Sequence, residues 1–512
     1  MSAPFASGPP MPHGRAAVGS PWWIRTASIA ALLVAAYFTG VLLMHPQRRV
    51  IEAVAGALLI YLAFHFSIYQ SLAFLLVVYP YPTHTTGGST NTLILLVIAV
   101  VWAARVTAGE LKVSFRSLLT PYLPVIALGY LLSTYSIHTP EEFTGGMAVL
   151  TDVLSCICLY FMVVNFVTDE RALRRTLVFL GISSILIHAV AVYEVVFPGR
   201  AFLPGWLLSP IEKIAGHRGY VRTGGPFRDF ELLSEYCAVI MPIVLFLWVR
   251  SQPGRRLFWT VVLALTLFSL YATVTRGGFI SVSIGLAYLA WLLHKELGLA
   301  KTVATVVVGA GLLLGAGAAL PAFLGTMSMF SRLEETKIVH GVPDSRVAAW
   351  GPALQRALEK PILGHGPLYT FGSGLTKYPW PHNGYLFLWV TIGITGLLGY
   401  VLAFLTCFFA TGRYRGAYTS GPFAPGLLTA LHVSWLVLIV DQLKIDFERN
   451  QIYFLFVWLL MGLTAAAWNI VAHPANAAQP AAPLPAPAPP RRAIPAPAGA
   501  AATGRIRKIM DP

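Results

Sequence analysis

Long, uninterrupted apolar blocks are the feature that most constrains this chain. They run for about 17–25 residues between short charged segments, the length that an α-helix needs to cross a hydrocarbon core. Because the blocks are continuous rather than alternating, they exclude a transmembrane β-barrel. Hydrophobic residues make up 56% of the chain and charged residues 11%, whereas roughly a quarter of a soluble domain is charged. The sequence therefore predicts an all-α polytopic membrane protein.

The blocks predict about 12–14 transmembrane helices. Candidate spans lie near 24–44, 50–65, 66–80, 91–108, 119–136, 147–167, 175–196, 233–249, 257–274, 278–293, 302–321, 383–410, 425–441 and 451–471. The short loops rich in Lys and Arg all fall on one side of this arrangement, which the positive-inside rule makes cytoplasmic. Both termini are then expected to be cytoplasmic, and two long loops, about 197–232 and 322–381, to be periplasmic.

Three regions follow from these patterns. Residues 1–23 are rich in Pro, Gly and small residues and predict a disordered cytoplasmic tail, since they lack the pattern of a signal peptide. Residues 24–472 are expected to form the transmembrane domain, and 473–512 predict an extended, Pro/Ala-rich cytoplasmic tail.

The four cysteines all lie in apolar segments and have no metal-binding spacing. Positive cytoplasmic loops explain much of the formal net charge of +15, so no nucleic-acid partner is expected.

Arginines near the predicted periplasmic ends of the spans are candidate ligands for phosphate. Arg222 and Arg228 flank the turn in "RTGGPFRDFELLSEY", and Arg276 sits in a very short hairpin, "TRGGF". A guanidinium group presents a planar, permanently charged fork that suits phosphate oxygens. Two alternatives stay open: Arg222 and Arg228 can instead reach lipid headgroups, and Arg276 can form a structural ion pair.

The segment "PDSRVAAWGPALQRALEKPILGHGP", residues 343–367, predicts an amphipathic helix in the second long loop. Pro361 is expected to end this helix, and glycines turn the chain after it. Arg346 lies in the first turn, where it can direct a cation towards the membrane surface or remain a solvated interfacial residue. The expected apolar face consists of Val347, Trp350, Leu354 and Leu358.

The segment "YPWPHNGYLFLW" begins a span with a histidine and an asparagine. A neutral imidazole such as that of His382 can accept a proton near neutral pH. Asn383 can cap the helix or hold the tautomer of the histidine. Asp441, at the periplasmic end of a later span, is a further ionisable candidate because charged groups within spans are costly.

In this order, "RTGGPFRDFELLSEY", "TRGGFISVSIGL", "DSRVAAWGPALQRALEKPILGHGP" and "HNGYLFLWVTIGITGLLGY" resemble the O-antigen ligase/polymerase superfamily of bacterial envelope glycosyltransferases. The resemblance covers roughly residues 220–465. It implies a GT-C-like membrane fold in the bacterial inner membrane with an active site facing the periplasm. It also implies inverting glycosyl transfer without a metal or cofactor, from a glycan on undecaprenyl diphosphate to an acceptor such as lipid A-core.

Residue by residue, the resemblance implies a catalytic role for His382 and diphosphate binding by Arg276 and Arg346. Arg222 and Arg228 are further diphosphate-binding candidates, and Asp441 and Asn383 are supporting residues. The residues suit this chemistry: arginines can stabilise a developing diphosphate charge, and a positioned base can activate a sugar hydroxyl.

Two alternatives to the ligase remain open from the sequence. A lipid-linked glycan polymerase differs from a ligase only in its acceptor, which no motif identifies. A transporter or flippase for a lipid-linked glycan is the alternative of another class. The absence of an evident internal repeat weighs against a transporter.

Overall fold

The computed structural model describes chiefly residues 65–81, 88–138, 140–198, 222–304, 342–367, 380–416 and 418–473, with a few shorter pieces. Several predicted features lie wholly or largely outside these residues. They are both tails, most of the two long loops, and the candidate spans 24–44, 50–65 and 302–321.

Within the described residues, eight helices are long and apolar enough to cross a membrane, judged by length and composition. They are α6 (Pro140–Phe166), α7 (Glu170–Val196), α8 (Phe230–Arg250), α9 (Pro253–Ala272), α10 (Arg276–Leu297), α14 (Gly384–Arg413), α15 (Phe423–Asp441) and α16 (Gln451–Ala472). Three shorter apolar helices are α3 (Ile68–Val78), α4 (Thr90–Thr107) and α5 (Leu123–Ser133). The prediction of an all-α polytopic membrane protein is confirmed, while the count of 12–14 spans, the GT-C-like fold and the two long periplasmic loops stay predictions.

The remaining elements are short or lie outside the bundle. The helix α13 (Asp344–Glu359) precedes α14, and three 3₁₀ turns are η1 (Thr134–Ser136), η2 (Gly225–Phe227) and η3 (Phe447–Arg449). Two pairs of two-residue strands are antiparallel: β1 (His84–Thr85) with β2 (Gly88–Ser89), and β3 (Ile338–Val339) with β4 (Val342–Pro343). In register, His84 pairs with Ser89 and Ile338 with Pro343.

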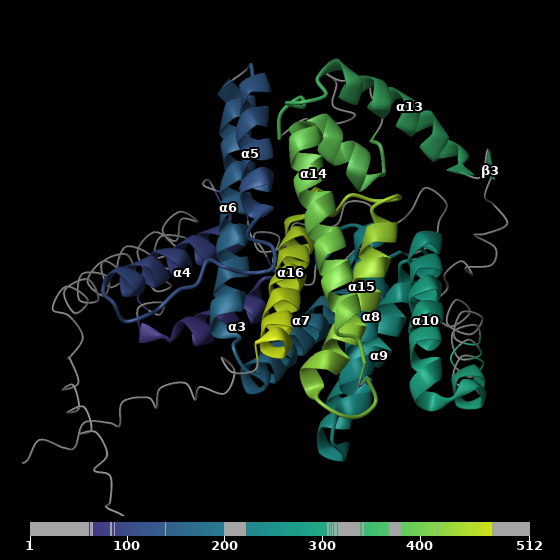
Figure 1. Ribbon diagram of the computed structural model, residues 1–512. Helices are drawn as coiled ribbons and strands as arrows, with labels where there is room; N and C mark the ends of the chain where they lie inside the picture. The colour runs from purple at the N-terminus through teal and green to yellow at the C-terminus, as the bar shows by residue number, and fades with distance from the viewer. Residues whose placement is uncertain are drawn as a thin grey trace, which may run out of the picture.

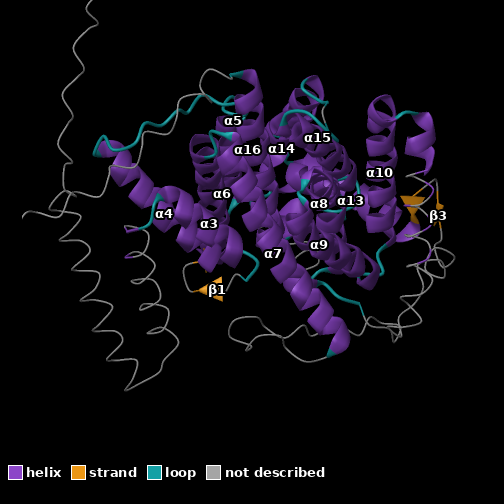
Figure 2. Cartoon of the chain, turned by 90° about the horizontal axis from the view of Figure 1, so that it is seen from below, coloured by secondary structure: helices purple, strands orange, loops and turns teal. Residues whose placement is uncertain are grey.

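The centre of the bundle is formed by α8, α15 and α16, whose apolar side chains are mostly buried on all sides. The more exposed α10 stands at one edge, and α3 and α4 lie at the opposite edge (Figure 1 and Figure 2). The helix α13 lies across one end of the bundle, over the start of α8 (Figure 2). A helix that is apolar all round can take such a buried position, because every one of its faces can pack against other apolar helices.

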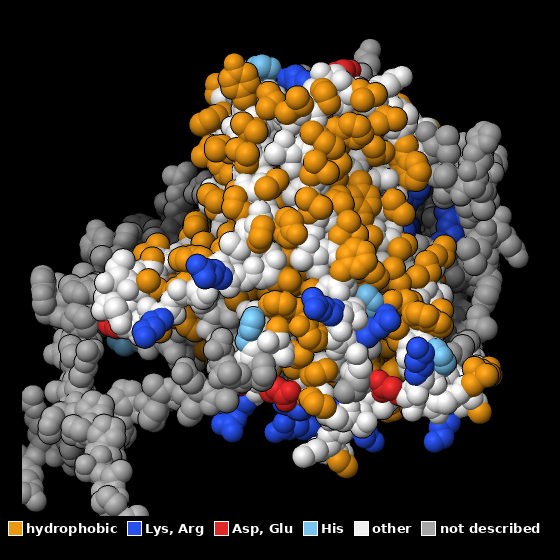
Figure 3. Space-filling model, viewed as in Figure 1, with side chains coloured by type: hydrophobic (Ala, Val, Ile, Leu, Met, Phe, Trp, Pro, Cys, Tyr) orange, Lys and Arg blue, Asp and Glu red, His pale blue; other side chains and the backbone are white. Residues whose placement is uncertain are grey.

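The two ends of the bundle differ in charge. At the first, the guanidinium of Arg174 lies 3.7 Å above the ring of Phe423 and Arg250 donates to the carbonyl of Gly421. We call this the basic end, where α7, α9 and α15 begin and α8 and α10 end. Figure 3 shows Lys and Arg gathered low on the visible face, below a broad hydrophobic surface. The other, site end is where α8, α10 and α14 begin and α15 ends, so each long helix runs between a basic loop and the site end.

At the site end, α14 is interrupted by Gly393, whose φ is +69° and ψ −178°. The turn after α13 packs into this interruption through backbone hydrogen bonds. Ile394 N donates to Pro361 O (2.8 Å) and His365 N to Val390 O (2.8 Å). Gly364 also has a positive φ, +71°. Pro361, Gly364 and Gly366 form a Pro-x2-Gly-x-Gly motif. This turn therefore satisfies backbone groups that the broken helix leaves unpaired.

Replacing Gly393 with alanine is expected to destabilise the protein by about 2–6 kcal/mol. A positive φ combined with a ψ near 180° is a conformation occupied almost only by glycine and costs another residue about 1–3 kcal/mol. The added Cβ would also clash with the Ile362 carbonyl oxygen, an overpacking cost of about 1–3 kcal/mol. Thermal unfolding in detergent measures the change. Gly351→Ala is the control, because nothing lies within 4 Å of its added Cβ. Equal unfolding temperatures for the two variants would contradict the argument.

The predicted helix in the second long loop exists as α13 and ends before Pro361 as expected, but its buried face is not the predicted one. The buried side chains are Ala349, Ala353 and Ala357, whereas Leu354 is 41% exposed and Leu358 58% exposed. The side chain of Val347 lies outside the described residues. Small residues let α13 approach α14 closely, as small residues do at helix contacts in membranes. The larger leucines consequently face away from the bundle.

Candidate functional site

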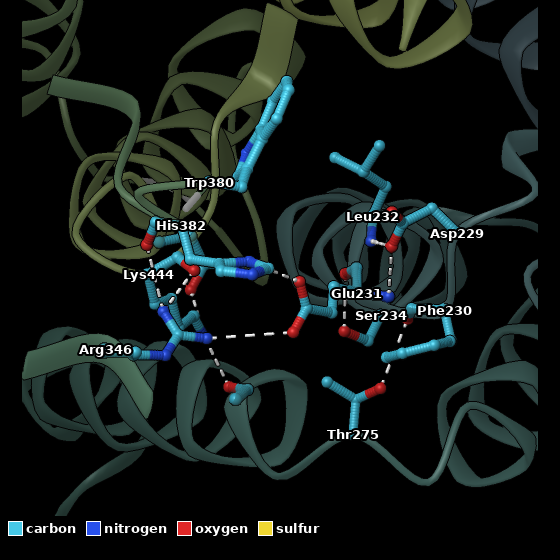
Figure 4. Close-up of polar contacts among 12 residues, drawn as sticks. Asp229, Phe230, Glu231, Leu232, Ser234, Thr275, Arg346, Trp380, His382 and Lys444 are labelled. Carbon is cyan, nitrogen blue, oxygen red and sulfur yellow. Dashed lines mark hydrogen bonds and ion pairs between the residues drawn. The ribbon is translucent and has the colours of Figure 1, made fainter. Parts of the chain in front are cut away.

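Four segments distant in sequence meet at the site end: the start of α8, the start of α10, α13 and the residues that precede α14 (Figure 4). The turn after α15, residues 442–450, joins them through Lys444. Figure 4 shows the side chains of Glu231, His382 and Arg346 directed towards one another. The predicted pair of Arg346 and His382 is therefore in direct contact, and Glu231 joins it.

The helix α13 is fixed to the start of α14 by a pair of side chains one helical turn apart. Arg346 Nη1 donates to the carbonyl of His382 (3.1 Å), and Trp350 Nε1 donates to the carbonyl of Pro381 (2.9 Å). Side chains at i and i+4 lie on the same face of a helix, so they reach two consecutive carbonyls. The same Arg346 Nη1 also donates to the carbonyl of Lys444. The Arg-x3-Trp spacing thus fixes the backbone at His382.

His382 has a left-handed backbone conformation, with φ +46°. Such a conformation is uncommon outside glycine and persists where surrounding contacts over-determine it. The next residue, Asn383, is 6% exposed and caps α14 by accepting a hydrogen bond from Leu386 N (3.0 Å). Gly384 N donates to Gln442 O (2.7 Å). The sequence left open whether Asn383 caps the helix or holds the tautomer of His382, and in the structure it caps the helix.

Glu231 lies between His382 and Arg346, and the sequence analysis did not assign it a role. Its Oε2 is 3.3 Å from His382 Nδ1, within ion-pair distance but without hydrogen-bond geometry, and its Oε1 is 3.8 Å from Arg346 Nη2. All three side chains are only partly buried, with exposed fractions of 21% for Glu231, 35% for His382 and 19% for Arg346. The one available sequence signal was the position of Glu231 just after the Arg-flanked turn.

Asp441, a predicted supporting residue, is fully buried beneath this group. Its Oδ1 is 2.6 Å from Lys444 Nζ and accepts a hydrogen bond from Ser281. Lys444 Nζ also donates to the carbonyl of Gly277 and to Ser281. One ammonium group therefore fixes the end of α15 to the start of α10, while the carbonyl of Lys444 accepts from Arg346. Asp441 is linked to Arg346 through Lys444, and its supporting role stays a prediction.

Lys444→Met is expected to lower stability by about 3–5 kcal/mol, because it leaves the buried Asp441 carboxylate without its cation. The double variant Lys444→Met/Asp441→Asn removes both charges and is expected to recover a large part of this loss. Thermal unfolding of the two variants in the same detergent gives the comparison. A double variant no more stable than the single one would contradict a paired-charge role.

The other predicted arginines differ in their surroundings. Arg222 Nε donates to Thr273 O (2.8 Å), and its guanidinium lies 3.3 Å above the ring of Phe230. Arg228 is exposed and has a left-handed backbone, φ +54°. Arg276 is partly buried at the first position of α10, next to Gly277. Arg222 thus has contacts within the protein that hold the start of α8 against the α9–α10 turn, and diphosphate binding by all three stays a prediction.

The turn that carries Lys444 is held at its far side by Glu448. Tyr130 OH donates to this carboxyl group, and Tyr130 OH is also 3.2 Å from Tyr400 OH. Burial raises the pKa of Glu448 to about 7, with the tyrosine hydrogen bonds acting in the opposite direction.

Among the described residues, no group of three or more His, Cys, Asp or Glu side chains could hold a metal ion. The groups present in the site are an imidazole, a carboxylate and guanidinium groups.

Part of the chain matches a known protein family. Residues 261–401 match the family described as O-antigen ligase. The match contains Arg276, Arg346, His382 and Asn383, whereas Arg222, Arg228, Glu231 and Asp441 lie outside it. No curated protein matches the sequence. The expected resemblance is confirmed over this part of the chain: the match of residues 261–401 to the O-antigen ligase family supports the O-antigen ligase/polymerase superfamily.

Proposed function

We propose that the protein transfers a glycan from undecaprenyl diphosphate to an acceptor such as lipid A-core, with inversion and without a metal, at the periplasmic face of the bacterial inner membrane. The observation that carries this proposal is the convergence of His382 and Arg346 at the site end, within the residues that match the O-antigen ligase family. The basic loops gather at the opposite end of the helices. Under the positive-inside rule this arrangement supports a periplasmic site, and the proposal includes cytoplasmic termini.

The chemistry follows from the groups present. His382 takes the proton of the acceptor hydroxyl while that oxygen attacks the anomeric carbon. The bond from this carbon to the diphosphate oxygen breaks, and its electron pair leaves with the lipid diphosphate. Arg346 and Arg276 stabilise the charge that develops on the diphosphate, because fixed cations in a partly dry site are already oriented before the reaction.

Transfer by the purified protein tests the proposal. A defined undecaprenyl-diphosphate glycan is offered with lipid A-core and, in a parallel reaction, with a second lipid-linked glycan. Ligation to lipid A-core with free undecaprenyl diphosphate as co-product is the expected result. Extension of the lipid-linked glycan instead would make the protein a polymerase. Movement of the donor across vesicle membranes without any transfer would make it a transporter and reject the proposal.

A further inference from the structure

A carboxylate occupies the position between the proposed base and the proposed diphosphate ligand. The two oxygens of Glu231 face different partners: Oε2 lies 3.3 Å from His382 Nδ1, and Oε1 lies 3.8 Å from Arg346 Nη2 (Figure 4). The contact with the imidazole is made at Nδ1, so Nε2 is the nitrogen that does not face Glu231. A carboxylate in this place interacts with both the imidazole of His382 and the guanidinium of Arg346.

The backbone that carries Glu231 is held from several directions. The Asp229 side chain caps α8 by accepting hydrogen bonds from Glu231 N (2.8 Å) and Leu232 N (3.2 Å). The preceding residue, Phe230, has its carbonyl bonded by Thr275 Oγ1 (3.3 Å) and its ring covered by Arg222. A carboxylate on such a fixed turn is pre-organised, which is what an orienting group requires. Arg222 and Thr275 thereby contribute to the site through the start of α8.

We propose that Glu231 is a positioning residue for His382 and an internal counterion for Arg346, a role that rests on the proposed glycosyl transfer. The carboxylate holds the proton of His382 on Nδ1, which leaves Nε2 to accept the proton of the acceptor hydroxyl. Once Nε2 is protonated, the imidazolium charge is balanced by Glu231. Contacts of this kind are often loose before substrate binds and tighten in the reacting complex.

The second half of the role concerns the donor. Without a donor, Glu231 neutralises Arg346 in a partly buried place, where an unpaired charge is costly. A diphosphate that enters the site competes with Glu231 for the guanidinium, since charge-assisted hydrogen bonds to phosphate are strong and bidentate. Displacement from Arg346 leaves the carboxylate to His382 alone. Donor binding then leaves Glu231 in contact with His382 during the step in which His382 accepts the proton.

Glu231→Gln separates these effects, because it keeps the shape of the side chain and removes its charge. The turnover rate is expected to fall about 10- to 100-fold, as when the group that orients a functional histidine is lost. Affinity for the undecaprenyl-diphosphate glycan is expected to stay the same or to rise, because the competitor for Arg346 is gone. The measurements are kcat for transfer and the Kd for donor binding, both on the purified full chain.

The control is a similar trio formed by the end of α13 and the turn that follows it. Glu359 forms an ion pair with Arg356 and lies 4.0 Å from His365 Nε2. Glu359→Gln changes the same residue type in the same way and is expected to leave both kcat and donor Kd within about twofold of the starting protein, since exposed ion pairs contribute little.

Glu231→Asp is the rescue variant, because it restores the charge on a shorter side chain. Recovery of at least part of kcat relative to Glu231→Gln supports the proposal. The proposal is wrong if Glu231→Gln keeps kcat within twofold, or if Gln and Asp variants both lose donor binding and activity together. His382→Ala distinguishes the two levels of argument: full transfer by that variant rejects the proposed function itself, whereas an inactive His382→Ala beside an active Glu231→Gln rejects only the role of Glu231.

Discussion

Replacing His382 is expected to reduce the transfer rate by about 10²–10⁴-fold while donor binding persists. A positioned general base contributes this much when the nucleophile is a weakly acidic hydroxyl. Donor binding persists because the proposed diphosphate ligands, Arg276 and Arg346, belong to other elements. The side chain of His382 is not needed to hold Arg346, since the arginine bonds to its backbone carbonyl.

The choice of substitution matters because His382 has a φ of +46°. Alanine resists this conformation, whereas asparagine tolerates it. His382→Asn therefore keeps the backbone that Arg346 and Trp350 bind, yet it supplies no side chain that accepts a proton near neutral pH. Both His382→Ala and His382→Asn are expected to show this reduced transfer rate, and the asparagine variant is expected to unfold at the higher temperature of the two.

The measurements are transfer kinetics, donor binding and thermal unfolding of each variant. His138→Ala is the control, since His138 is an exposed histidine next to η1 and belongs to no part of the site. Undiminished transfer by His382→Asn, with a normal unfolding temperature, would reject the role of His382 as base.

The sequence predicted those parts of the fold that depend on local pattern. Continuous apolar blocks identified the long helices, because a membrane span is recognised from its own residues alone. The break at Gly393 was not predicted, and the span 383–410 was expected to be continuous. This break depends on backbone hydrogen bonds to the turn at residues 361–366, and hydropathy carries no information about a partner so far away in the chain.

The predicted site contained His382 and Arg346, which the structure brings into contact, but not Glu231, the acid that lies between them. His382 and Arg346 were recognised because each stands out in a short motif. Glu231 follows an Asp cap in the first turn of a helix, where an acidic residue has an ordinary explanation in the helix dipole. The sequence analysis also assigned no role to Lys444, because a lysine in a loop likewise has an ordinary explanation. Their roles arise from packing between α8, α10 and α13, which no spacing within a single segment indicates.

The apolar face of α13 shows the same limit at a smaller scale. Leu354 and Leu358 dominated the predicted face because a helical pattern is weighted by hydrophobicity. The buried residues are instead Ala353 and Ala357, because only small residues let α13 approach the broken part of α14 closely.

Arg346→Ala is expected to lower kcat/KM for the lipid donor by at least about 10²-fold, the loss that follows removal of one fixed donor to a developing negative charge. The variant removes at least three interactions at once: the hydrogen bonds to the carbonyls of His382 and Lys444, and the ion pair with Glu231. Both the position of the base and the stabilisation of the leaving group are therefore expected to suffer, so kcat and donor affinity fall together.

Arg346→Lys tests which of these contributions dominates. Lysine keeps the positive charge but has no planar fork, and it cannot reproduce the geometry in which one guanidinium nitrogen bonds two carbonyls. If charge alone matters, the lysine variant recovers most of the activity. We expect instead that it remains at least about tenfold slower than the starting protein, since the guanidinium also fixes the backbone at His382.

The control for both variants is Arg356→Ala, on the same helix. Arg356 pairs with Glu359 near the surface, and loss of that pair is expected to change kcat/KM by no more than about twofold. Combining Arg346→Ala with Glu231→Gln completes the test. Because the two side chains lie within 3.8 Å of each other, their effects are expected to be non-additive, with the double variant losing less than the product of the single losses. Independent, multiplicative losses would mean that Glu231 and Arg346 act separately, and the exchange of Arg346 from Glu231 to the diphosphate would then be wrong.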